Sequence, residues 1–411
     1  MQKTILKNYA KLLARVGLNV QKGQEAIIVA ELDQTEFVAY CVEECYRAGA
    51  AKVRVEWTSQ PLARLRADQC SEQILGEVSP WQEEKLKCEV HTLPARLYLD
   101  SDDPDGLNGI DAEKYARATQ ARSAIIKPYR DKMENRYQWC IAAVPGRAWA
   151  KKVFPKDSAS MAEEKLWRAI LSSSRALNGN PVANWQEHDR ELEARCAYLN
   201  SLKLCSLEYR GENGTNLRVG LMENGLFAGG GERTLAGVYF NPNIPSEEVY
   251  TTPMRGQAEG IVYSTKPLSW QGQLIRNFSV RFSEGKAVEV HAAQGESVLK
   301  KMIGMDEGAA YLGECALVPH RSPISESRIL FYNTLFDENA ACHLALGRGF
   351  FNCLRGYETM DDDQIKAAGV NDSMIHTDFM IGNDELDIDG VTQTGARVPL
   401  FREGNWAFRV E

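Results

Sequence analysis

The chain has 411 residues, of which 44% are hydrophobic, and a formal net charge of −8 at pH 7. A chain of this length can bury one or two substantial cores, so two domains are expected, and neither disulfides nor a structural metal is needed for folding. The negative charge without clustered Lys and Arg argues against a nucleic-acid partner. A mean hydropathy of −0.37, with no apolar run of ~18 residues, excludes a transmembrane helix and a membrane partner.

Residues 1–16 predict an amphipathic surface helix, because apolar residues recur at helical spacing with lysines between them. A signal peptide would instead carry an unbroken apolar stretch and a small-residue cleavage site. The ten cysteines form no CxxC pair and no regular spacing, which predicts reduced thiols in a cytoplasmic protein. Cys315 and Cys342 lie beside candidate ligands, but we interpret them as buried thiols.

Residues 1–186 alternate between strand and helix patterns. Buried or alternating runs predict strands at residues 24–32, 52–57, 97–99 and 139–144, with helices at 37–48 and 112–122. This alternation predicts a doubly wound α/β domain with a mostly parallel sheet. No GxGxxG follows the first strand, so no dinucleotide site is evident, and we interpret Gly229–Gly231 as a flexible loop.

Residues 187–411 have a different pattern. Short strand candidates at 204–209, 216–221 and 273–282 are accompanied by turn sequences such as Glu212-Asn213-Gly214. This pattern predicts an α+β domain with an antiparallel-rich sheet, and we expect it to be the metal-binding catalytic domain.

Residues 308–319 are mostly apolar with strand character, and Glu314 is their only charged residue. Burying an ionised carboxylate costs several kcal/mol unless a cation or dense hydrogen bonding compensates. A metal ion would compensate it. On this segment alone, pairing with an arginine or a place on an edge strand explains Glu314 equally well.

Residues 329–347 are expected to form a strand, a turn and a helix. Asp337 is a candidate N-cap that precedes Glu338 and an apolar helix containing His343. A single histidine on an apolar helical face is more often a core residue than a ligand, so His343 is only a candidate.

Residues 373–381 place His376 and Asp378 two positions apart. On a strand these side chains point to the same face and form a two-ligand arm. His-x-Asp alone is a weak signal, but three segments each bring a carboxylate or imidazole into an otherwise apolar element. Neutral imidazole with carboxylates suits zinc, cobalt or manganese.

Over nearly its whole length the chain resembles the M29 metallo-aminopeptidases. The blocks that carry the resemblance are residues 214–221, 243–250, 308–319, 331–347, 371–390 and 399–408. The resemblance implies metal ligands at Glu248, Glu314, His343, His376 and Asp378, with Glu338 as a further contact. Glu248 rests on the resemblance alone, because Glu247-Glu248 by itself is typical of a solvated strand or helix start.

The resemblance also implies an activity. Members of this family remove the amino-terminal residue from peptides with two divalent metal ions, for which zinc, cobalt, manganese and magnesium are candidates, and they act as homodimers. In that chemistry Glu314 is the expected bridging ligand, and Glu248 a ligand or the general base. One position departs from the family pattern: Phe350 stands where a tyrosine is expected, so Tyr332 or Tyr357 would have to supply a hydroxyl, or none is needed.

Two alternatives remain at this point. Ring-cleaving dihydroxypyridine dioxygenases resemble the family and use a comparable carboxylate and histidine set with iron. They lack a full second-metal set, so Glu248, Glu314 and His343 together favour the peptidase. The other alternative is a non-catalytic metal-binding or scaffold homologue, for which Phe350 is the argument.

Overall fold

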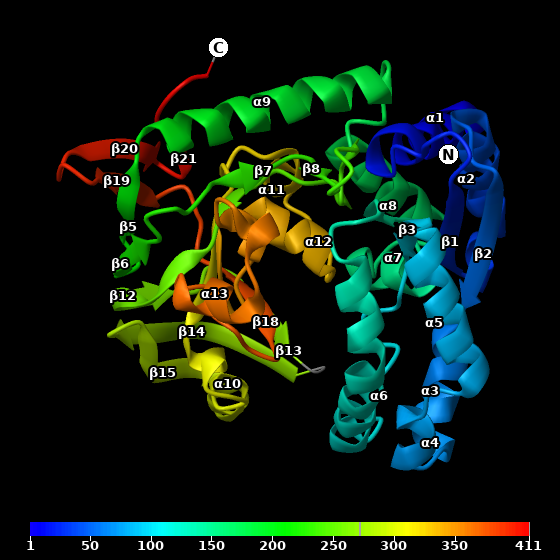
Figure 1. Cartoon of the computed structure of the whole chain (residues 1–411), viewed down its shortest axis with the longest axis horizontal. Helices are drawn as coiled ribbons and strands as arrows, with labels where there is room; N and C mark the ends of the chain where they lie inside the picture. Colours follow the sequence, from blue (N-terminus) through cyan, green and yellow to red (C-terminus); the bar gives the residue numbers. More distant parts are fainter. Residues whose placement is uncertain (271–272, 411) are drawn as a thin grey trace. The chain divides into compact units, whose positions relative to one another are not determined.

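The computed structural model describes residues 1–270 and 273–410. Its chain forms two compact units, coloured along the sequence in Figure 1. The first contains residues 1–187 and 231–245, and the second contains residues 188–230 and 246–411. Residues 231–245, which follow the start of the second region in sequence, therefore pack with the first unit.

The first unit is built on a parallel sheet with strand order β10-β4-β3-β1-β2. Its strands are β1 (Glu25–Glu31), β2 (Lys52–Thr58), β3 (Ala95–Asp100), β4 (Trp139–Ala143) and β10 (Asn243–Ile244). The apolar run of β1 lies inside the sheet, with β2 and β3 parallel on its two sides. The expected parallel α/β fold is confirmed.

Helices connect these strands: α1 (Lys3–Leu12), α2 (Thr35–Ala48), α3 (Gln60–Gln69), α4 (Glu72–Gly76), α5 (Pro80–Thr92), α6 (Ala112–Met133), α7 (Arg147–Val153) and α8 (Ala159–Ser173). Helix α2 ends at Gly49, which adopts the left-handed conformation as expected. Helix α6 continues past the expected end at Arg122 and contains Pro128.

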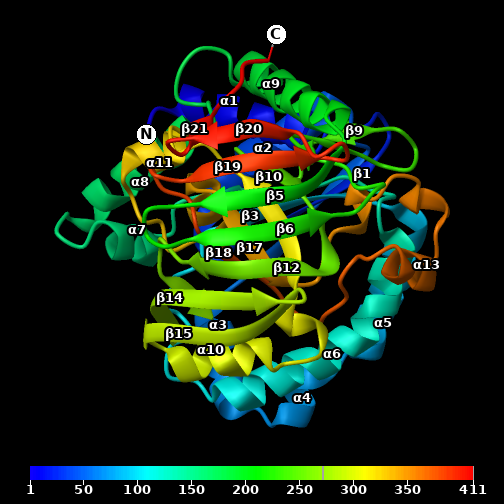
Figure 2. The same ribbon diagram turned by 90° about the vertical axis from the view of Figure 1, so that its left-hand side faces the viewer.

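The second unit contains two antiparallel sheets, and Figure 2 faces the larger one. The larger has the order β13-β14-β12-β6-β5-β19-β20-β21, with β15 beside β14. Its strands are β5 (Leu204–Arg210), β6 (Asn216–Leu221), β12 (Pro253–Tyr263), β13 (Leu268–Trp270), β14 (Gln273–Ser283), β15 (Lys286–Gln294), β19 (Asp387–Thr392), β20 (Arg397–Arg402) and β21 (Asn405–Trp406). The antiparallel-rich second region is also confirmed.

The smaller sheet has the order β18-β17-β16-β11-β7. Its strands are β7 (Ala228–Gly229), β11 (Val249–Thr251), β16 (Leu312–Leu317), β17 (His343–Gly347) and β18 (His376–Met380). One face of this sheet contributes to a core shared with the larger sheet, through Cys315, Leu317, Leu344, Leu346, Phe379 and Ile381. Because side chains alternate along a strand, the residues between these belong to the other face.

The remaining helices are α9 (Pro181–Ser201), α10 (Glu296–Ile303), α11 (Pro323–Ser327), α12 (Thr334–Asp337) and α13 (Asp362–Ala367). The expected flexible loop at Gly229–Gly231 is wrong in part, because β7 ends at Gly229 and the two-stranded β8 (Glu232–Arg233) and β9 (Tyr239–Phe240) pair follows. Within the described residues, no helix is both long and apolar enough to cross a membrane.

Candidate metal centre

The face of the smaller sheet that points away from the core carries the candidate ligands. Ala345 of β17 pairs with Glu314 on one side and with Asp378 on the other, and His343 pairs with Ala316. Directly paired residues of antiparallel strands share a face. The register therefore gathers ligands from three strands around small alanine side chains.

His343 lies on a strand and not on the expected helix. Helix α12 ends at Asp337, a short 3₁₀ turn ends at Ala340, and Ala341 is extended, with φ −161°. The five residues of β17 are all buried, and a short apolar run of this kind cannot be assigned to helix or strand from its periodicity.

Asp337 does not cap a following helix, as was expected, because it is the last residue of α12. Its carboxylate instead accepts hydrogen bonds from the backbone N–H groups of Phe331 and Asn333, at 2.9 and 3.1 Å. The side chain closes the turn before α12, so the expected N-cap assignment is wrong.

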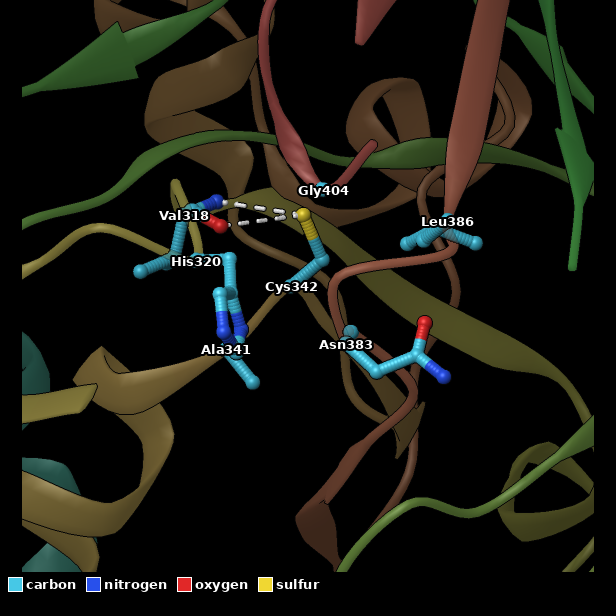
Figure 3. Close-up of a pocket in the computed structure, with 8 residues that line it drawn as sticks. Val318, His320, Ala341, Cys342, Asn383, Leu386 and Gly404 are labelled. Atoms are coloured by element: carbon cyan, nitrogen blue, oxygen red, sulfur yellow. Dashed lines mark hydrogen bonds between the residues drawn. The ribbon is translucent and has the colours of Figure 1, made fainter. Parts of the chain in front are cut away.

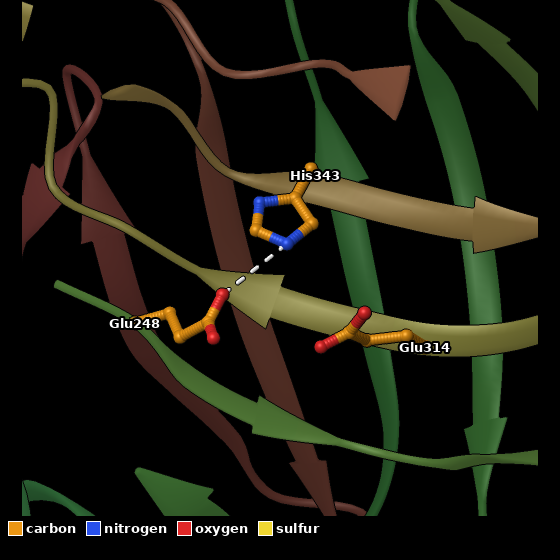
Figure 4. Close-up of side chains that lie close together, drawn as sticks. All are labelled: Glu248, Glu314 and His343. Atoms are coloured by element: carbon orange, nitrogen blue, oxygen red, sulfur yellow. Dashed lines mark ion pairs between the residues drawn. The ribbon is translucent and has the colours of Figure 1, made fainter. Parts of the chain in front are cut away.

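Glu248 immediately precedes β11 and is 9% exposed, so the solvated position suggested by its local sequence is wrong. Its Oε2 lies 3.4 Å from Nε2 of His343. Figure 4 shows the carboxylates of Glu248 and Glu314 gathered beside the His343 ring. Glu314 lies on the central strand β16, which excludes the edge-strand alternative, and no Lys or Arg among the described residues forms an ion pair with it.

Two groups of three candidate ligands overlap at Glu314. One contains Glu248, Glu314 and His343, the other Glu314, His376 and Asp378, and within each group one ligand atom per residue lies within 4.8 Å of the others. Nε2 of His376 is 3.2 Å from both Glu314 Oε2 and Asp378 Oδ1. Nitrogen and oxygen ligands 2.0–2.2 Å from a tetrahedral divalent ion lie ~3.4 Å apart, so these separations fit shared metal ions.

The hydrogen bonds of the two histidines also fit metal binding. Nδ1 of His343 is 3.1 Å from the carbonyl oxygen of Ala341, and Nδ1 of His376 is 2.7 Å from that of Arg348. A neutral imidazole that donates from Nδ1 presents the lone pair of Nε2 to its other neighbours. In both residues those neighbours are carboxylates, and Oδ1 of Asp378 is buried without a hydrogen bond. A cation between these atoms satisfies both kinds of ligand.

A glycine supports this geometry at the end of β17. Gly347 has φ +106°, and a Cβ there would lie 2.1 Å from the carbonyl oxygen of Ile375. Any other residue would be strained and would push β18 away. Gly347 thus lets the chain turn so that the Arg348 carbonyl reaches the ring of His376.

The electrostatics of the cluster indicate a deficit of positive charge. Burial raises the pKa of Glu314 to about 7. Burial alone would lower the pKa of both histidines, but the neighbouring carboxylates outweigh it and raise the pKa of His343 to about 10 and that of His376 to about 11. Without a cation, these buried groups hold protons to neutralise one another.

Glu338 belongs to neither three-ligand group. Its carboxylate is nevertheless close enough to respond to the cluster, because burial and then the charges of Asp378 and Glu248 raise its pKa well above the usual range. Its Oε1 is 3.5 Å from the amide nitrogen of Asn339. Glu338 therefore lies beside the cluster as a candidate further contact.

Phe350 lies at the edge of the cluster. Its ring is 4.8 Å from the ring of His376 and 5.3 Å from that of Tyr250, measured between centroids. Tyr250 pairs with Ala316 and so shares the face of the candidate ligands, a position that its local sequence does not predict. Of the two tyrosines expected to supply a hydroxyl, Tyr332 is 44% exposed and Tyr357 packs against Phe351.

The neighbouring cysteines are buried thiols. Sγ of Cys342 is 3.3 Å from both the backbone nitrogen and the oxygen of Val318, as drawn in the pocket of Figure 3. Burial raises the pKa of Cys342 to about 12, and that of Cys315 also to about 12. Because the thiolate is the reactive form, neither is placed as a nucleophile.

Comparison with known proteins gives a consistent result. The model of the M29 family, described as thermophilic metalloprotease, matches residues 2–406. Aminopeptidase AmpS of Bacillus subtilis is 39% identical over 404 residues, and Aminopeptidase T of Thermus aquaticus is 40% identical over 402 residues, each covering 98% of both chains. The solved structure of AmpT from Thermus thermophilus covers 99% of this chain and all of its own, with a TM-score of 0.91 and 39% identity.

A second solved structure shares the fold alone. The 2,5-dihydroxypyridine dioxygenase of Pseudomonas putida KT2440 superposes with a TM-score of 0.50 at 12% identity, covering 98% of both chains. A likeness at this level of identity carries no argument about activity.

Proposed function

The chain belongs to the M29 family of metalloproteases, and we propose that it is a metal-dependent aminopeptidase that removes the amino-terminal residue from peptides with two divalent cations. The observation that carries the two-cation centre is the shared position of Glu314. This one carboxylate belongs to both candidate groups, so it would be the ligand shared by two cations bound there.

The charge of the cluster supports two cations. Four carboxylates, those of Glu248, Glu314, Glu338 and Asp378, surround two histidines that bind metal in their neutral form. Two divalent cations neutralise four carboxylates. Oxygen and imidazole ligands without thiolates suit zinc, cobalt or manganese, and the carboxylates keep magnesium among the candidates.

Each residue then has a role in hydrolysis. Two divalent cations held there would supply an activated water near neutral pH and a Lewis acid for the scissile carbonyl. Glu248 and His343 would hold one side of the centre and His376 and Asp378 the other, and Glu248 is the residue placed to accept the proton of the water. Side-chain exposure rises from 1% at His343 to 26% at His376, so the peptide approaches from the His376 side.

The cellular setting is also part of the proposal. All ten cysteines are free thiols, which favours a reducing compartment such as the cytoplasm. We propose that the protein acts there as a homodimer, which rests on its family membership. The metal-binding residues all belong to the second compact unit.

The test compares hydrolysis of an aminoacyl chromogenic substrate by chelated and metal-restored protein. We expect chelation to stop hydrolysis, zinc, cobalt, manganese or magnesium to restore it, and an N-acetylated version of the substrate to resist cleavage, since an aminopeptidase requires a free amino terminus. Metal binding without hydrolysis would identify a non-catalytic homologue. Ring cleavage of a dihydroxypyridine with ferrous iron would identify a dioxygenase.

A further inference from the structure

The backbone that carries Glu248 is held by two buried side chains outside the ligand set. Oδ1 of Asn339 accepts a hydrogen bond from the backbone N–H of Glu247, at 2.7 Å. Nε2 of His188, on α9, donates to the carbonyl oxygen of Ser246, also at 2.7 Å. Asn339 is 0% exposed and His188 is 6% exposed. The segment before Glu248 is thus fixed at two consecutive residues.

Asn339 also reaches a second segment of the centre. Its Nδ2 donates to the carbonyl oxygen of Leu335, at 2.9 Å, and makes a longer contact of 3.5 Å with Oε1 of Glu338. The backbone carbonyl oxygen of Asn339 accepts a hydrogen bond from Oγ of Ser322, at 3.1 Å. One amide group therefore connects the backbone beside Glu248 with the carboxylate of Glu338.

We propose that Asn339 is a positioning residue of the metal centre, which sets the distance between the Glu248 segment and Glu338, with His188 as the second anchor of the same segment. The inference rests on the proposed two-cation function. The amide of Asn339 provides both an acceptor for the Glu247 N–H and a donor for the opposite side, whereas a carboxylate lacks the donor and a hydroxyl is too short. Residues that orient metal ligands in this way typically change metal affinity 10–100-fold when removed.

The test measures metal dissociation constants by chelator competition, well below the melting temperature of every variant. We expect Asn339→Ala to weaken metal binding 10–100-fold, and to lower kcat at saturating metal with a smaller change in KM. Asn241→Ala is the matched control: Asn241 is 1% exposed in the first unit, and its Oδ1 accepts from Nε1 of Trp185 at 2.7 Å. This control should lower the melting temperature without changing metal affinity.

A second pair of variants covers the case in which Asn339→Ala does not fold. His188→Met removes the donor to Ser246, whereas His188→Gln keeps an N–H near the place of Nε2. We expect weaker metal binding in the first and recovery in the second. Equal metal affinity in wild type, Asn339→Ala and His188→Met would overturn the inference, because the two residues would then only stabilise the fold. Failure of the wild-type protein to bind metal would instead overturn the proposed function.

Discussion

Two glutamates of this protein are almost equally buried but have opposite surroundings. Glu89, on α5 in the first unit, is 1% exposed, and Glu314 in the second unit is 4% exposed. The carboxylate of Glu89 pairs with Arg96 and with Arg54, the latter at 3.3 Å. That of Glu314 faces histidines and other carboxylates. Arginines of the chain itself compensate the charge of Glu89, whereas the cations proposed for Glu314 have to bind from solution.

This difference separates a structural buried charge from a functional one. A buried carboxylate with fixed guanidinium partners is complete in the folded protein, and removing one partner leaves a charge uncompensated. The charge of a buried carboxylate among other acids is fully compensated only when a cation binds. The burial of an acid therefore does not identify a metal ligand, whereas the sign of its neighbours does.

The largest effect expected from this comparison is that of Glu314→Gln. The substitution keeps the side-chain volume but removes the charge shared by both ligand groups, so hydrolysis should fall ~10²-fold or more. The melting temperature of the metal-free protein should stay near or above that of wild type, because a buried acid has been neutralised. Retention of more than about a tenth of the wild-type rate would show that Glu314 does not bridge.

A smaller loss is expected at the arm on β18. His376→Ala and Asp378→Ala each remove one ligand of the same group and should lower metal affinity by similar factors, about 10–100-fold. Metal analysis after dialysis measures the effect. Full occupancy in both variants would mean that this pair has a structural role only.

The metal-free protein should lose stability as pH rises. The pKa values of Glu314, His343 and His376 are about 7, 10 and 11, all above their usual values, so the folded state binds more protons than the unfolded state. Stability contributed in this way is present in full below the unfolded pKa values, about 4.5 to 6.5, and is lost as pH rises through the folded values of about 7, 10 and 11. Melting curves with and without chelator measure it, and the metal-bound form should show a weaker slope because cations replace these protons. Equal slopes of stability against pH with and without chelator would contradict the replacement of these protons by cations.

Glu89→Gln should lower stability and leave catalysis unchanged, the reverse of the effects expected for Glu314→Gln. It removes the carboxylate partner of Arg96, while Arg54 keeps its ion pair with Glu25, and we expect a loss of about 1–3 kcal/mol in the free energy of unfolding. Metal affinity and kcat should not change. Denaturant unfolding and chelator competition on the same sample measure both quantities, and a change in metal affinity would remove the distinction between the two glutamates.

The sequence predicts some residues of the candidate metal centre and not others. The candidate ligands on β16 and β18 can be selected from the sequence because Glu314 is the only charge in an apolar strand and because His376 and Asp378 lie on one face of a strand. Glu248 could not, since what buries it is the long-range pairing of β11 with β16, which leaves no trace in the local sequence. For His343 the candidate N-cap at Asp337 before an apolar run predicts a helix, but such a short run fits a strand equally well, and pairing with β18 decides its conformation. Nothing in the local sequence marks Asn339 or His188, because the backbone atoms that they bind, in Glu247 and Ser246, lie far away in the sequence.

The smallest effect expected is that of Phe350→Tyr. The Phe350 ring packs against His376 and Tyr250 at the open side of the cluster, so an added hydroxyl extends from a residue that is only half-buried. If it reaches the tetrahedral intermediate, it adds a donor that acts mainly in the transition state, and kcat should rise with little change in KM. If it meets apolar atoms instead, the buried hydroxyl should cost about 1–3 kcal/mol of stability with no gain in rate.

The structure favours a gain in kcat, because the ring already touches a metal-ligand candidate, and the gain should be a few-fold because Tyr250 offers a hydroxyl on the same face of the sheet. Tyr250→Phe is the matched variant. If Tyr250 supplies the donor that Phe350 lacks, Tyr250→Phe should lower kcat, and Phe350→Tyr should restore part of the loss in the double variant. Comparing kcat, KM and melting temperature across the four proteins decides the matter: an unchanged kcat in all of them would mean that neither ring contributes a hydrogen bond to the reaction.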